Sequence, residues 1–124
     1  MSNKIAKHSR SEEDYLESIL LLTEEQKFVH RIEIAKKMNV SQAAVNKAVK
    51  LLQEKGYLYE EGKHLYFTEA GKKQALSVFE RHCTLREFFL SLGVSPATAE
   101  QDACNMEHLL SEETFAAMKK YLQK

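Results

Sequence analysis

The sequence predicts a mainly α-helical fold that carries one small β-hairpin, and three observations lead to this prediction. Apolar residues recur at helical spacing through most of the 124 residues. Three serines, Ser41, Ser95 and Ser111, stand where a helix would need an N-cap. Only the aromatic-rich stretch at 57–68, which folds back around Gly62, has the composition of paired strands.

The first three helices are predicted from their end signals. The first is expected to begin after Ser11 and to run to about residue 26. A short helix over about 31–38 would bury its apolar residues, Ile32, Ile34 and Ala35. After a tight turn, Ser41 would cap a third helix that ends near residue 55, where Gly56 follows as a C′ residue. Two short helices joined by a tight turn form a helix-turn-helix.

The rest of the chain is predicted to be helical after the hairpin. A long helix is expected over about 68–91, and Ser95–Pro96, an N-cap followed by a first-turn proline, opens another. Ser111 opens a last helix with two acidic residues at its positive end. A hairpin directly after a helix-turn-helix is typical of a winged helix. The predicted fold is therefore a winged helix-turn-helix followed by a helical segment.

Length and composition are those of an ordinary soluble protein, with 44% hydrophobic and 29% charged residues. The longest apolar run, residues 19–22, is far shorter than the roughly 20 residues that a membrane helix needs. The first residues lack the apolar stretch of a secretory signal, so we expect a cytoplasmic protein with no membrane partner. Cys83 and Cys104 are expected to be free thiols and, by default, small buried side chains.

The net charge of zero conceals a segregated pattern. Residues 26–75 hold ten Lys or Arg against five Asp or Glu, whereas 1–25 hold three against six and 76–124 hold five against seven. The basic segment contains the helix-turn-helix and the hairpin. This favours a phosphate-facing surface on that part of the chain.

The third predicted helix has two distinct faces. Val45, Val49 and Leu52 form a narrow buried stripe. The opposite face and its edges carry small, amide and lysine side chains suited to bases and phosphates, namely Gln42, Ala43, Asn46, Lys47 and Lys50. Lys63 lies at the hairpin tip, where a wing would touch the DNA backbone. The alternative interpretation is an ordinary amphipathic helix with a solvated lysine face.

The densest chemical signal is the group Cys104, Glu107 and His108. At i, i+3 and i+4 on a helix, a thiol, a carboxylate and an imidazole share one face and could converge on a transition metal. Asp14 with Glu17 in the first helix, and His82 in the long helix, are further candidate ligands. Each has a structural alternative: Asp14 could complete a capping box with Ser11, and the others could be solvated surface residues.

Five segments together resemble the diphtheria toxin repressor family of iron- and manganese-dependent regulators. They are Glu13-Asp-Tyr-Leu-Glu17, the helix-turn-helix from Ile34 to Val45, Phe67-Thr-Glu-Ala-Gly71, Arg81-His82 and Cys104-x-x-Glu107-His108. The resemblance implies a metal-activated repressor in which residues 1–70 bind DNA and 71–124 bind metal and dimerise. It also implies a palindromic double-stranded operator as the partner, and no small-molecule substrate.

The resemblance further assigns roles to individual positions. The residues that match family ligand positions are Asp14, Glu17, His82, Cys104, Glu107 and His108, and those that match base-facing positions are Ser41, Ala43 and Lys47. The sequence departs from the family at Arg86, where the family usually has a glutamate ligand, and Glu100 could take over from a lost ligand. A second complete metal site is therefore open to question.

The metal depends on how Cys104 binds. A thiolate ligand favours Fe(II) over Mn(II), with Zn(II) or Co(II) as further candidates, whereas ligation through the backbone carbonyl would remove this preference. Two other functions remain open. One is a winged-helix regulator that senses a small molecule or thiol oxidation at Cys83 or Cys104. The other is a small metalloenzyme, for which the sequence shows no arranged nucleophile, phosphate loop or general base.

Overall fold

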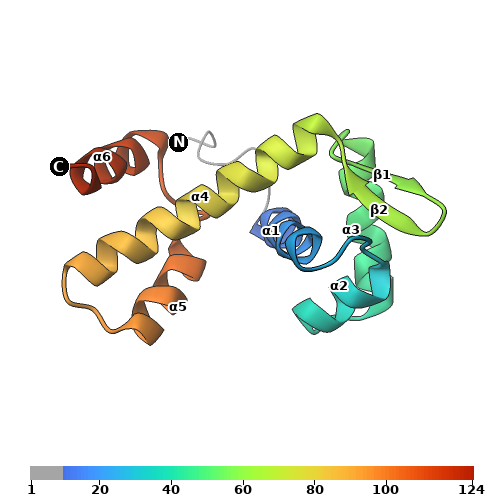
Figure 1. Cartoon of the computed structure of the whole chain (residues 1–124), viewed down its shortest axis with the longest axis horizontal. Coiled ribbons are helices and arrows are strands. Elements are labelled where there is room, and N and C mark those ends of the chain that lie inside the picture. Colours follow the sequence, from blue (N-terminus) through green and yellow to red (C-terminus); the bar gives the residue numbers. More distant parts are fainter. Residues whose placement is uncertain (1–9) are drawn as a thin grey trace. The chain divides into compact units, whose positions relative to one another are not determined.

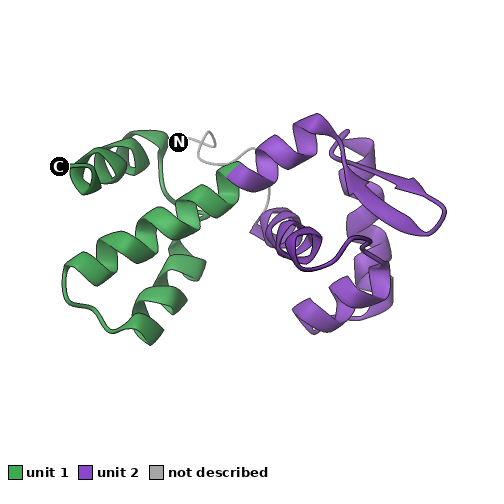
Figure 2. Cartoon of the chain, viewed as in Figure 1, with its two compact units in different colours: residues 1–9, 77–124 green, residues 10–76 purple. Residues whose placement is uncertain are grey.

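The computed structural model describes residues 10–124, and within them the predicted order of elements is confirmed (Figure 1). The elements are α1 (Arg10–Glu25), α2 (Arg31–Met38), α3 (Gln42–Glu54), β1 (Leu58–Glu61), β2 (His64–Phe67), α4 (Glu69–Ser91), α5 (Pro96–Met106) and α6 (Glu112–Leu122). The described residues divide into two compact units, Arg10–Leu76 and Ser77–Lys124 (Figure 2). We call them the N-terminal unit and the C-terminal unit. Helix α4 begins in the first and continues in the second.

The helix ends lie where the serines predicted them. The hydroxyl of Ser41 accepts a hydrogen bond from the backbone N–H of Ala44 at 3.1 Å, which caps α3. Ser95 and Ser111 cap α5 and α6 in the same way. The tight turn between α2 and α3 places Asn39 in the left-handed region at φ 57°. Asparagine tolerates this conformation better than most residues, so the sequence suits a tight helix-turn-helix.

The N-terminal unit packs α1, α2 and α3 against one another and the hairpin against α3 (Figure 1). Its core holds the predicted stripe of α3 together with α1 and α2, through Leu16, Ile19, Leu20, Ile34, Val45, Val49 and Leu52. Strands β1 and β2 are antiparallel, with Leu58 opposite Phe67 and Glu61 opposite His64. The N–H of Leu65 donates to the carbonyl of Val29 at 2.9 Å, so the segment before α2 extends the hairpin by one bridge.

The corner where the hairpin meets α4 is held by Thr68. Its hydroxyl accepts from the N–H of Gly71 at 2.9 Å and donates to the carbonyl of Gly56 at 2.6 Å. The first turn of α4 lies against the backbone at Tyr57 so closely that a Cβ at Gly71 would stand 1.9 Å from the Tyr57 carbonyl oxygen. Within the motif Phe67-Thr-Glu-Ala-Gly71, the threonine and the glycine are therefore explained by the packing of this corner.

Two sequence expectations for this unit are wrong. Helix α1 begins at Arg10, so Ser11 lies inside it and does not cap it. Ile32 is 51% exposed on α2, because the short helix buries only Ile34. The start of α2 carries an unpredicted cap, in which the N–H of His30 donates to the Glu33 carboxylate at 2.8 Å. This hydrogen bond lowers the pKa of Glu33.

The C-terminal unit is smaller and is built on the second part of α4 with α5 and α6 (Figure 2). Its buried apolar residues are Val78, Leu85, Ala99, Ala103 and Phe115. Arg81 ties α4 to the start of α6: it donates to the Leu110 carbonyl at 2.7 Å and to Glu112 at 3.0 Å, and its guanidinium lies over the Phe115 ring. No helix in residues 10–124 has the length and apolar character to cross a membrane.

Candidate metal centre and nucleic-acid interface

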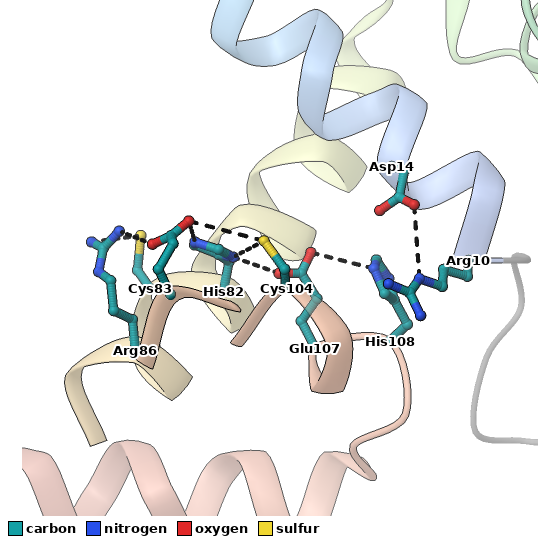
Figure 3. Close-up of polar contacts among 9 residues, drawn as sticks. Arg10, Asp14, His82, Cys83, Arg86, Cys104, Glu107 and His108 are labelled. Atoms are coloured by element: carbon teal, nitrogen blue, oxygen red, sulfur yellow. Dashed lines mark hydrogen bonds and ion pairs between the residues drawn. The ribbon is translucent and has the colours of Figure 1, made fainter. Parts of the chain in front are cut away.

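His82 on α4 lies between two carboxylates carried by α5 and its C-cap (Figure 3). Its Nδ1 is 2.7 Å from Oε1 of Glu107, and its Nε2 is 2.8 Å from Oε2 of Glu100. His82 is 4% exposed and Glu107 only 1% exposed. The alternative of solvated surface residues is therefore wrong for both. A buried histidine between two carboxylates belongs either to an ion-pair network or to a set of metal ligands.

Cys104 and His108 lie next to this pair. The Sγ of Cys104 is 3.8 Å from Nδ1 of His82 and 3.9 Å from Oε2 of Glu100. The Nε2 of His108, which is 6% exposed, lies 3.7 Å from Oε2 of Glu107. Cys104 is exposed, contrary to the expectation of a buried thiol. Its side chain faces His82 and Glu100 and not the apolar core (Figure 3). The cluster thus combines sulfur, nitrogen and oxygen donors.

This donor set fits a divalent transition metal. Oε2 of Glu107 is buried and has no hydrogen-bond partner among the residues that the structure describes. A buried carboxylate oxygen without compensation is costly, and a cation is one way to compensate it. Candidate ligand atoms of His82, Glu100 and Cys104 all lie within 4.8 Å of one another. Imidazole and thiolate ligands suit Fe(II), Co(II) and Zn(II), and carboxylates suit Mn(II) as well.

Arg86, one turn after His82 on α4, supplies a fixed positive charge at one edge of the cluster. Its guanidinium lies 3.3 Å from Oε1 of Glu100 and 3.8 Å from Sγ of Cys83 (Figure 3). The hydrogen bond to Glu100 raises the pKa of Arg86 above its usual range. Helical i, i+4 spacing places His82 beside Arg86 on α4 and Glu100 beside Cys104 on α5. The contact between the two pairs follows only from the packing of α4 with α5.

Asp14 and Glu17 lie on α1 in the N-terminal unit, and both are partly exposed. The carboxylate of Asp14 is 3.9 Å from the guanidinium of Arg10 within the same helix (Figure 3). A capping box between Ser11 and Asp14 is excluded because Ser11 lies inside α1. Metal ligation by this pair stays a prediction.

The predicted DNA-reading helix presents the predicted faces. The stripe of Val45, Val49 and Leu52 is 0–1% exposed. The predicted contact residues are all exposed: Ser41, Gln42, Ala43, Asn46, Lys47 and Lys50 on and before α3, and Lys63 at the hairpin turn. The side chain of Ser41 is also engaged in capping α3. A hollow of about 270 Å³ lies between the start of α2, the start of α3 and the hairpin. It is lined by His30, Arg31, Ile32, Gln42, Glu60 and Lys63.

Sequence reasoning missed two features of this surface. Arg31 donates to Asn46 at 3.1 Å and to Glu60 at 2.8 Å, so it joins α2, α3 and β1. His64 stacks on Phe28 with ring centroids 4.2 Å apart and meets His30 edge-on at 4.8 Å. Both depend on residues brought together by folding. The sequence signal for Arg31 was its place as a cation at the first residue of the helix-turn-helix, although its partners could not be predicted.

Comparison with known proteins now identifies the family. Residues 7–65 match the N-terminal DNA-binding domain of the iron-dependent repressors, and residues 68–124 match their metal-binding and dimerisation domain. The chain belongs to the iron-dependent repressor family. This confirms the resemblance to the diphtheria toxin repressor family and the winged-helix fold. The repressor is a metal-dependent, DNA-binding transcriptional regulator with a dimerisation domain, and its cofactor is a divalent metal.

Relatives of the repressor span nearly all of it. An HTH-type transcriptional regulator of Methanocaldococcus jannaschii is 35% identical over 119 residues, which cover 94% of this chain and 95% of that protein. The transcriptional regulator MntR of Escherichia coli O157:H7 is 37% identical over 113 residues, or 90% of this chain and 73% of that one. The structure of the manganese regulator SloR superposes with a TM-score of 0.78 at 27% identity, covering 90% of the repressor and 53% of SloR.

Proposed function

We propose that the repressor binds a divalent ion through Cys104, Glu107, His108 and His82, with Asp14 and Glu17 as further oxygen ligands, and that the ion strengthens its binding to an operator. The observation that carries this proposal is the buried carboxylate of Glu107. One of its oxygens pairs with His82, and the other has no hydrogen-bond partner among the described residues and could bind an ion. When bound, the ion would supply positive charge that compensates the negative charge of these carboxylates. Coupling of about 1–3 kcal/mol would change operator affinity by roughly 5–150-fold.

Fe(II) is the metal we favour, with Mn(II) second and Zn(II) or Co(II) as further candidates. The sulfur of Cys104 faces His82 and Glu100, as ligation through sulfur requires. A thiolate selects the softer ions over Mn(II). The manganese regulator SloR, which is 27% identical to the chain over the aligned region, supports Mn(II) as the alternative.

For DNA, we propose that α3 enters the major groove and that the hairpin touches the adjacent backbone. Gln42, Asn46 and Lys47 would contact bases, and Lys50 and Lys63 phosphates, because amides and lysines are suited to these partners. Two copies would present two such helices to a palindromic site, with half-sites about 34 Å apart or a multiple of it. In this division of labour residues 1–70 bind DNA and residues 71–124 bind metal and dimerise.

The dimer face that we propose lies on the C-terminal unit. An apolar groove of about 390 Å³ runs between the end of α4 and α6, lined by Phe88, Leu92, Ala117, Met118 and Tyr121 with Glu113 and Thr114. Leu92 is 62% exposed and Tyr121 is 57% exposed. Large apolar side chains exposed together are typical of an interface, and a second copy of the chain would cover them.

The test is DNA binding with and without metal. Separate selections from a random duplex pool, one with Mn(II) or anaerobic Fe(II) and one with chelator, supply probes free of bias. Fluorescence anisotropy then compares wild type with Glu107→Gln and with the control Asp102→Asn, which changes an exposed carboxylate on α5, the helix that Glu107 caps. We expect metal to tighten binding of wild type and Asp102→Asn, and Glu107→Gln to lose the response. DNA binding that ignores every metal would overturn the proposal.

A further inference from the structure

The two ring nitrogens of His82 face two different carboxylates. Nδ1 meets Glu107 on the buried side, and Nε2 meets Glu100, whose side chain is 50% exposed, on the outer side. The sulfur of Cys104 lies within 4 Å of both His82 and Glu100. The cluster therefore holds a second potential ligand set, composed of His82, Glu100 and Cys104, beside the set that contains Glu107 and His108.

A guanidinium already occupies the outer side of this second set. Arg86 lies 3.3 Å from Oε1 of Glu100, while Oε2 of the same carboxylate faces His82 at 2.8 Å. The second nitrogen of the guanidinium contacts Sγ of Cys83 at 3.8 Å, which fixes its direction. An arginine stays charged at any pH at which the protein folds. Glu100 is thus shared between an imidazole and a permanent cation.

We propose that the Arg86 guanidinium takes the place of a second metal ion. By pairing with Glu100 it keeps this carboxylate from joining His82 and Cys104 around a second cation, so that each chain holds only the ion of the proposed site. A second divalent ion on Glu100 would have to displace the arginine or accept its repulsion at close range. The inference rests on the proposed function, because it presumes that the Glu107 side of the cluster binds the first ion.

The experiment counts ions per chain. Equilibrium dialysis against Mn(II), with free Mn(II) followed by its electron paramagnetic resonance signal, is applied to the full chain. Wild type is expected to bind one ion. Arg86→Gln removes the charge and is expected to bind two, whereas Arg86→Lys keeps a cation and is expected to bind one. In the double variant Arg86→Gln with Glu100→Gln the second ion should be lost again. Circular dichroism melts show that each variant is folded.

The outcomes separate this inference from the proposed function. Two ions in wild type would overturn the inference and leave the proposed function standing. One ion in Arg86→Gln, with the melting curve and first-site affinity of wild type, would overturn it as well. No ion in wild type would contradict the proposed function, and the inference with it. The wild-type count can therefore overturn the inference even if a variant proves unstable.

Discussion

At the residue scale, the proposed metal site centres on Glu107, a carboxylate that is 1% exposed. Its neighbour His82 compensates one oxygen at 2.7 Å, and His108 lies 3.7 Å from the other. Buried charges persist in proteins when they are paired or when they coordinate metals. A position that forms one strong contact and leaves a buried oxygen beside a second imidazole is suited to metal binding.

We predict that the sulfur of Cys104 sets the metal preference, and Cys104→Ser tests this prediction. Cys104→Ser replaces a soft thiolate with a harder hydroxyl, so binding of Co(II), Zn(II) and Fe(II) should weaken by more than binding of Mn(II). We expect the near-ultraviolet charge-transfer band of the Co(II) protein to disappear in the variant. Competition titrations give the affinity ratios, with Cys83→Ser as the control. Equal losses for all four metals, with the band unchanged, would contradict ligation through sulfur.

At the element scale, the corner between the hairpin and α4 holds the wing in place. Thr68 bonds to both sides of the corner, and Gly71 lets the first turn of α4 lie against the backbone at Tyr57. No flexible side chain could move aside to make room, because the nearest atoms belong to the backbone. The wing therefore depends on a glycine within a helix.

Gly71→Ala should destabilise the fold although alanine is the better helix former. Relief of the contact requires a backbone shift, and overpacking of this kind costs about 1–3 kcal/mol or more. Urea unfolding gives the change in the free energy of unfolding. Ala70→Ser, at the exposed neighbouring position, serves as control and should change stability by less than about 0.5 kcal/mol. A Gly71→Ala protein as stable as the control would contradict the close approach.

Helix α3 makes a second prediction at this scale. If Lys47 contacts DNA, Lys47→Ala should weaken binding, and loss of a phosphate contact would reduce the slope of log K against log salt by about 0.9. Loss of a base contact would instead relax the sequence preference at that position. Anisotropy titrations over a salt series distinguish the two. Lys120→Ala on α6 is the matched control, and equal effects of both substitutions would argue against DNA contact through α3.

The end signals of the helices could be predicted from sequence because they are local. Ser41, Ser95 and Ser111 bond to backbone N–H groups three residues away, and Gly62 adopts its positive φ within the turn itself. The helical spacing of Cys104, Glu107 and His108 is also local, and it made them candidate ligands on one helix face. In the structure, however, α5 ends at Met106, Glu107 is its C-cap and His108 lies beyond the helix. Contacts between elements were beyond reach: the pairing of Arg86 with Glu100, the bridge of Val29 with Leu65, and the exposure of Ile32.

At the scale of the whole molecule, the operator binding that we propose requires two copies of the chain. A palindromic operator is read by a two-fold symmetric protein, and the exposed groove along α4 and α6 offers an apolar surface for the second copy. Interfaces of this type have an apolar core with charged residues at the rim. A charge placed in the groove should therefore separate the two copies.

Leu92→Glu tests this surface. Burial of a glutamate against the partner's apolar side chains is unfavourable, so the variant should be monomeric at concentrations where wild type is dimeric. Sedimentation velocity measures the state directly. Ile32→Glu, at another exposed apolar position in the N-terminal unit, should remain dimeric. A dimeric Leu92→Glu protein would place the interface elsewhere on the chain.

The most direct test of the central claim is metal affinity measured with and without DNA. If metal strengthens operator binding, thermodynamic linkage requires the operator to strengthen metal binding by the same factor. Mn(II) or Fe(II) titrations of the free protein and of its operator complex should therefore differ by the ratio found for DNA binding with and without metal, roughly 5–150-fold. Identical metal affinities in the two titrations would contradict a metal-switched repressor.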